Sequence, residues 1–154
     1  MRRNEKEIKD LSVIESIIKK AKVMRLALCD GNQPYIIPLN FGYLNHVFYF
    51  HSANEGKKLE IIQKNPLVCI EIDDEIGIVS DPKGKACNWS ATYESIIASG
   101  KAEIVLDKQE KIKGMDLIMK QYSENQFEYG ENALNGVTLV KIVVNQMTGK
   151  ESKK

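Results

Sequence analysis

One stretch in the first half of the chain combines residue types that bind phosphate. A strand-like run ends at His51 and Ser52, a turn containing Gly56 follows, and a short helix then holds Lys57 and Lys58 in its first turn. The start of a helix carries unpaired N–H groups and a partial positive charge, to which a hydroxyl and two ammonium groups can add. The spacing predicts an anion site here. In the alternative interpretation, both lysines are solvated surface charges and Ser52 is a helix cap.

His51 stands alone at the end of its predicted strand, and only one other histidine, His46, occurs in the chain. An imidazole titrates near neutral pH, so His51 is a candidate proton donor. The alternative is a structural histidine that only forms hydrogen bonds. The sequence leaves both roles open.

The run from Tyr35 to Tyr43 contains a proline inside a strand-like pattern. Proline lacks the N–H that a strand ladder uses, so such a run lies at a sheet edge or faces a ligand. Backbone groups freed in this way can pair with a flat, polar ring. An ordinary edge strand is the alternative. The candidate ring contacts are Ile37, Pro38, Leu39, Asn40 and Phe41.

A third candidate segment surrounds Trp89, the only tryptophan of the chain. The alternating pattern that follows places Tyr93 and Ser95 on the same face of a strand, and Gly100 allows a bulge or sharp bend. A single tryptophan is more typical of a core or an interface than of a cofactor stack. We nevertheless include Trp89, Tyr93 and Ser95 among the candidate cofactor contacts.

The remaining periodicity predicts short helices among many strands. We expect an N-terminal helix within residues 1–22, near 11–22 and opened by a capping box at Ser12 and Glu15, and helices within 52–65 and from 107 onward. Strands are expected at 24–29, 35–43, 47–51, 67–73, 91–99, 101–106 and 137–144, with a long loop at 74–88, an irregular 123–136 and a frayed tail at 146–154. Many strands with hairpin-length spacings favour a closed antiparallel barrel, since closure removes exposed edges. The prediction is one mainly β domain over residues 1–154.

Bulk composition excludes several classes of protein. The 154 residues carry a formal net charge of +1, which gives no field for binding nucleic acid or an anionic membrane. The apolar runs are too short to span a bilayer, and no signal peptide is evident. Three scattered cysteines and two histidines predict neither a disulfide framework nor a metal site, so a cytoplasmic protein is expected.

Three segments in this order resemble the pyridoxamine 5′-phosphate oxidase-like flavoproteins, and within them the nitroimidazole-resistance (Nim) branch. They are VFYFHSANEGKKLEIIQKNPLVCIEI, CNWSATYESIIASGKAEIV and VKIVVNQMTGKE, and the resemblance runs from about Met24 to Glu151. It implies a split barrel, a homodimer, and FMN (with FAD as the alternative) in the groove between subunits.

The resemblance also implies roles for individual residues. The phosphate-binding positions of the oxidases match His51, Ser52, Gly56, Lys57 and Lys58, and a glutamine at the ring edge matches Ser95. An arginine and a lysine of their ring-lining strand are here Tyr35 and Asn40. The Nim branch places a histidine near the flavin, and His51 takes that place. An arginine-rich C-terminus of the oxidases has no counterpart, so oxidation of pyridoxamine phosphate is not expected.

The resulting hypothesis is an FMN-dependent oxidoreductase that takes electrons from a nicotinamide donor and reduces a nitro group or a similar small acceptor. His51 is its candidate catalytic residue, in the role of proton donor. The alternative hypothesis is a flavin- or haem-binding sensor or reservoir without turnover, in which His51 would be a haem ligand.

Overall fold

The computed structural model describes residues 3–153, apart from the side chain of Glu75. Eight strands, four α-helices and two short 3-10 helices follow one another along this part of the chain. In chain order they are η1 (Asn4–Lys6), β1 (Glu7–Ile8), α1 (Leu11–Lys20), β2 (Met24–Asp30), β3 (Gln33–Leu39), β4 (Gly42–Leu44), β5 (Val47–Ser52), α2 (Lys57–Lys64), β6 (Leu67–Val79), η2 (Ala86–Asn88), β7 (Ser90–Ile104), α3 (Lys108–Lys120), α4 (Glu131–Asn135) and β8 (Thr138–Ser152).

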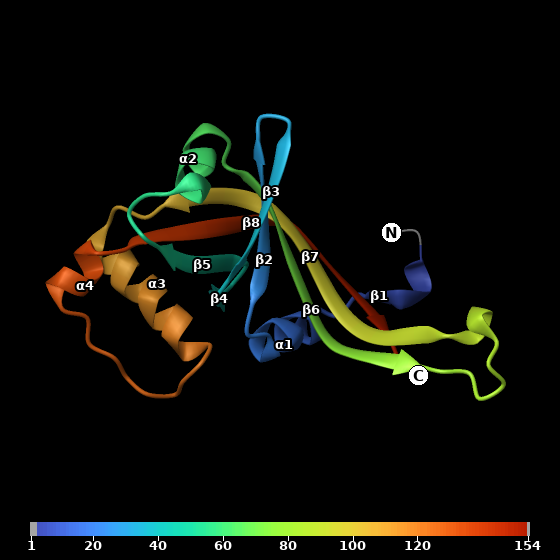
Figure 1. Ribbon diagram of the computed structural model, residues 1–154. Coiled ribbons are helices and arrows are strands. Elements are labelled where there is room, and N and C mark those ends of the chain that lie inside the picture. The colour runs from blue at the N-terminus through green and yellow to red at the C-terminus, as the bar shows by residue number, and fades with distance from the viewer. Residues whose placement is uncertain (1–2, 154) are drawn as a thin grey trace.

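All strand pairs are antiparallel and form one sheet in the order β3-β2-β6-β7-β8-β5-β4, with β1 on β8. The two end strands, β3 and β4, are separated in the chain only by Asn40 and Phe41. So short a connection forces the sheet to curl until its ends approach each other. The predicted mainly β split barrel with short helices is confirmed (Figure 1).

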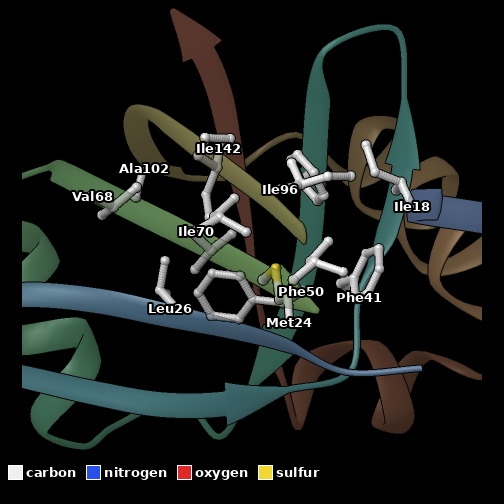
Figure 2. Packing of buried hydrophobic residues seen from close by; sticks show 14 of the residues in the cluster. Ile18, Met24, Leu26, Phe41, Phe50, Val68, Ile70, Ile96, Ala102 and Ile142 are labelled. Carbon is white, nitrogen blue, oxygen red and sulfur yellow. The ribbon is translucent and has the colours of Figure 1, made fainter. Parts of the chain in front are cut away.

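The inward faces of these strands form the core of the barrel. Side chains alternate along each strand, so every second residue points inward; on β2 these are Met24, Leu26 and Leu28. Leu26, Phe50, Ile70, Ile96 and Ile142 are fully buried and come from five strands (Figure 2). Helix α2 adds Leu59, Ile61 and Ile62 to the same cluster. The core therefore holds α2 against the barrel.

The N-cap of helix α1 lies two residues before the predicted one. Asp10, not Ser12, is the N-cap, and its carboxylate accepts hydrogen bonds from the Ser12 N–H and hydroxyl, both at 2.8 Å. These bonds, which favour the ionised form, hold the pKa of Asp10 below its usual range. The prediction of a Ser12–Glu15 box was wrong because a better acceptor lies two residues upstream.

Gln121, at the end of α3, caps the C-terminal end of α1. The Gln121 amide nitrogen lies 2.8 Å from the carbonyl oxygens of Ile18 and Ala21 and 3.2 Å from that of Lys19. The last carbonyls of a helix have no partner within the helix. We expect Gln121→Ala to lower the free energy of unfolding by about 1–2 kcal/mol in urea denaturation. The exposed Gln126 supplies the control: an equal loss in Gln126→Ala would contradict this role.

The long strands account for most differences from the sequence-based elements. Residues 74–79, predicted as loop, continue β6, and the pairing with β7 changes register between Asp74 and Gly77. The two strands predicted around Gly100 are one strand, β7, with a register shift between Ser99 and Gly100 opposite β8. Of the tail 146–154 predicted to be frayed, residues 146–152 belong to β8 and pair with β7 and β1, and residue 154 lies outside the described residues. Backbone pairing with distant strands overrides the weak local signals at all three places.

Two smaller differences concern the predicted strand 35–43 and the irregular segment 123–136. The former divides into β3 and β4, and the latter contains α4. None of the helices within residues 3–153 is long and apolar enough to cross a membrane.

Candidate functional site

The start of α2 is open on its N-terminal side. Gly56 is the N-cap, with φ 128° and ψ 163°, and no side chain caps the helix. A Cβ placed on Gly56 would meet no atom within 4 Å. This left-handed φ strains any residue other than glycine. The space beside Gly56 is therefore open at the start of α2, next to the exposed Lys57 and the half-buried Lys58.

Ser52 supplies a hydroxyl group just before this helix. Its side chain is buried at the end of β5, and its Oγ has no hydrogen-bond partner among residues 3–153. A buried hydroxyl without a partner is costly, and such groups in native proteins often await a ligand or water. Only four residues separate Ser52 from Lys57. The hydroxyl, the open helix start and the lysines thus belong to one short segment.

Asn54 fixes the turn between Ser52 and α2. Its amide nitrogen donates to the Asn135 carbonyl at 2.7 Å, and its amide oxygen accepts from the Thr138 hydroxyl at 3.0 Å. Both partners lie at the junction of α4 and β8. These two bonds hold the chain ahead of the helix in one conformation, as a pre-formed anion site requires.

Strand β3 brings a second set of groups to α2, because the Lys57 ammonium lies 5.1 Å from the centre of the Tyr35 ring. β3 pairs with β2 on one side only and ends the sheet. Pro34, Ile36 and Pro38 are alternate residues of β3, so their backbone groups point to the same side of the strand. Proline is tolerated in a strand where its missing N–H would point away from the neighbouring strand, here β2. The Ile36 N–H and the carbonyls of all three residues are then directed to the unpaired edge of β3.

A shallow groove of about 620 Å³ runs over the sheet next to this strand. Tyr35 lines it, together with apolar side chains that include the exposed Ile36 (61%) and Leu67 (58%) and the thiols Cys29 and Cys69. Volumes of this order hold small organic ligands. Tyr35 therefore joins the groove to the start of α2.

The predicted ring contacts near β3 divide into two groups. Ile37, Pro38 and Leu39 lie on the strand, half-buried or exposed. Asn40 is engaged elsewhere, since its amide donates to the Lys22 carbonyl at 3.2 Å. The Phe41 side chain is fully buried in the barrel core, and its N–H donates to the Tyr122 hydroxyl at 3.0 Å (Figure 2).

Trp89 follows η2 directly, and Tyr93 and Ser95 are in the first half of β7. They belong to the arm formed by β6 and β7, whose tip at η2 is at the opposite end of the molecule from α2 (Figure 1). The Tyr93 ring has the ammonium groups of Lys6 and Lys150 at 5.6 Å each. Within one chain these three residues do not join the cluster of Ser52, Lys57 and Lys58.

His51 is exposed, whereas its neighbour Ser52 is buried. Successive side chains of a strand point to opposite faces, so His51 and Ser52 lie on opposite sides of β5. His51 and Ser52 are therefore adjacent in the sequence motif, but their side chains lie on opposite faces of β5.

Sequence analysis placed Tyr35 on the ring-lining strand but missed its contact with Lys57, and it missed the thiol-lined groove. No local signal could reveal the contact between Tyr35 and Lys57, which are 22 positions apart and on different elements. Cys29 and Cys69 stand in strand-like stretches, where a cysteine is commonly a small buried residue, yet Cys29 is exposed and Cys69 only half-buried. Within the described residues, no group of three metal-ligating side chains could hold a metal ion.

Comparison with known proteins places the chain in a family. The family model described as pyridoxamine 5′-phosphate oxidase matches residues 10–151. A solved structure of a candidate 5-nitroimidazole antibiotic resistance protein from Bacteroides thetaiotaomicron is 38% identical, with a TM-score of 0.85 over 94% of this chain and 86% of that one.

More distant structures share the fold. The flavocytochrome Anf3 from Azotobacter vinelandii is 14% identical, with a TM-score of 0.86 over all of this chain and 72% of that one. The FAD and heme binding protein from Mycobacterium smegmatis is also 14% identical, with a TM-score of 0.83 over 97% of this chain and 74% of that one.

One curated relative, an uncharacterized protein of Rhizobium meliloti, is 25% identical over 85 residues, so the match spans 55% of this chain and only about half, 54%, of the relative. The family model spans nearly the whole chain, and the strands and helices it covers form the barrel described above. The chain belongs to the pyridoxamine 5′-phosphate oxidase family.

Proposed function

We propose that this protein is an FMN-binding oxidoreductase whose flavin phosphate binds at the start of α2. The observation that carries the proposal is the buried Ser52 hydroxyl, which has no partner among the described residues and lies next to an uncapped helix start. A phosphate group would satisfy the hydroxyl and the free helix N–H groups together, and Lys57 and Lys58 would offset its charge. These residues fit the phosphate end of FMN.

The free edge of β3 suits the ring of the same molecule. The flavin ring system presents donors and acceptors along its pyrimidine edge, which the Ile36 N–H and the carbonyls of Pro34, Ile36 and Pro38 complement. The apolar groove beside Tyr35 offers a surface for its flat faces. The ring and phosphate would then bind on two sides of Tyr35. FAD is the alternative cofactor at this site.

We further propose that two copies of this chain form a homodimer around the flavin. Trp89, Tyr93 and Ser95 can contact a flavin held at α2 only if a second chain supplies them. The arm that carries them exposes Ile76, Ile78 and Trp89, which are 65%, 68% and 54% accessible. Large apolar side chains exposed together are typical of protein interfaces.

Bound FMN would supply the redox chemistry, so the chain needs no nucleophile of its own. The proposed substrate is a small nitro compound, because the 38%-identical relative is described as a 5-nitroimidazole resistance protein. Reduction of a nitro group to a nitroso group takes two electrons and two protons and releases water. A nicotinamide donor would supply the electrons. His51 is the candidate proton donor, provided that the ring reaches the exposed face of β5.

Native mass spectrometry of the purified protein tests cofactor and assembly together. We expect a dimer that carries one FMN per chain, and a yellow protein whose flavin absorbance is bleached by NADH or NADPH and restored by a nitroimidazole. A monomer would overturn the dimer proposal. Colourless protein that takes up no added FMN would overturn the proposed function.

A second candidate function is a flavin- or haem-binding protein without turnover. It is favoured by the exposed imidazole of His51, which is accessible as a haem ligand, and by the fold shared with a flavocytochrome. A Soret band that is lost in His51→Ala, or a bound flavin that no nicotinamide donor reduces, would support this function over the first.

A further inference from the structure

Tyr35 contacts the proposed phosphate site through its ring, because the Lys57 ammonium lies 5.1 Å from the ring centre. This separation is within the range of an attractive cation–π contact. Tyr35 is half-buried and packs against the barrel core, whereas Lys57 is exposed. Core packing therefore constrains the Tyr35 ring more than it constrains the Lys57 side chain.

We propose that Tyr35 is a positioning residue for the flavin phosphate and acts through Lys57. The inference rests on the proposed FMN site. A lysine side chain loses considerable rotamer freedom when it binds a ligand. A ring that already holds the ammonium near the helix start reduces that loss, because part of the ordering occurs during folding.

An aromatic ring suits this role better than a carboxylate would. A carboxylate beside Lys57 would neutralise its charge and compete with the incoming phosphate for the ammonium hydrogens. The face of an aromatic ring attracts the cation but carries no net negative charge. The three N–H donors of Lys57 therefore stay available to the phosphate. No ion pair of Lys57 occurs among residues 3–153.

The position of Tyr35 also suggests how a bound ligand is oriented in the site. The same side chain lines the apolar groove and contacts Lys57. A ligand with a flat ring at one end and a phosphate at the other would meet Tyr35 between its two parts. The loss of Tyr35 should therefore weaken the binding of phosphorylated flavins more than the binding of riboflavin, which lacks the phosphate.

The test compares FMN with riboflavin in two variants at this position, by isothermal titration calorimetry. Tyr35→Leu keeps an apolar side chain but removes the ring face, and we expect it to weaken FMN binding about two- to fivefold more than it weakens riboflavin binding. Tyr35→Phe retains the ring face and should retain the wild-type ratio of the two dissociation constants. In a Lys57→Ala background, Tyr35→Leu should change that ratio no further.

Two results would overturn the inference in different ways. If wild-type protein binds FMN no more tightly than riboflavin, the proposed phosphate site is wrong, and the role of Tyr35 fails with it. If the wild type prefers FMN and Tyr35→Leu keeps that preference in full, or weakens both ligands equally, only the role of Tyr35 is wrong. Thermal denaturation of each variant checks that the protein is folded.

Discussion

Replacing both Lys57 and Lys58 by alanine is expected to weaken FMN binding by about 2–4 kcal/mol, taking about 1–2 kcal/mol for each charge-assisted hydrogen bond. This corresponds to a dissociation constant about 30- to 900-fold higher. Both residues lie in the first turn of α2, where the helix has no side-chain cap. Titration with FMN, followed by quenching of flavin fluorescence, gives the constants.

Riboflavin and a second pair of lysines control this experiment. Riboflavin lacks the phosphate, so its affinity should change little in the double variant. The exposed Lys113 and Lys120 on α3 provide a matched change of two charges on a helix away from α2. Lys113→Ala with Lys120→Ala should bind FMN as the wild type does. If the α2 double variant also binds FMN normally, the phosphate binds elsewhere.

Gly42→Ala is expected to destabilise the fold by about 3 kcal/mol, because β4 and α3 pack backbone against backbone at this point. An added Cβ would lie 2.5 Å from the Ile118 nitrogen and 2.6 Å from the Leu117 carbonyl oxygen. No side-chain rotation can relieve contacts with backbone atoms, so the helix must move away from the strand. Calorimetry should show a melting temperature lower by about 6–12 °C.

Gly130→Ala provides the comparison for this loss. A Cβ at Gly130 would meet nothing within 4 Å, and its φ of −64° suits any residue. We expect this variant to lose at most about 1 kcal/mol, through the poorer N-cap of α4. Equal melting temperatures for the two variants would contradict the close packing of α3 on β4.

Several elements could be predicted because their signals are local. Buried and more exposed residues alternate along β2, and α3 begins after Asp107, whose carboxylate accepts a hydrogen bond from the Glu110 N–H at 2.8 Å. The turn at Gly31 between β2 and β3 follows equally from residue type. Each of these elements depends on the types and spacing of neighbouring residues, so it can be predicted from the sequence.

The lengths of the strands and the contents of the site depended on long-range pairing. The last residues of β8 look like a charged, unstructured tail, but β7 and β1 fix them as a strand. Phe41 looks like part of the ring-lining run, but the barrel core takes its side chain because β3 and β4 divide there. Local composition cannot show which distant strand will pair with a given segment.

The sequence by itself determined the class of this protein, mainly β with short helices, and the run of Ser52, Lys57 and Lys58 that suits a phosphate group. These features follow from residue type and spacing along one segment. The tertiary structure alone decided that Tyr35 contacts Lys57, that β3 has an unpaired edge, and that the β6–β7 arm, with Trp89 next to η2, extends away from α2 (Figure 1). The physical reason is that sheet closure and strand register bring together, or hold apart, residues distant in the chain.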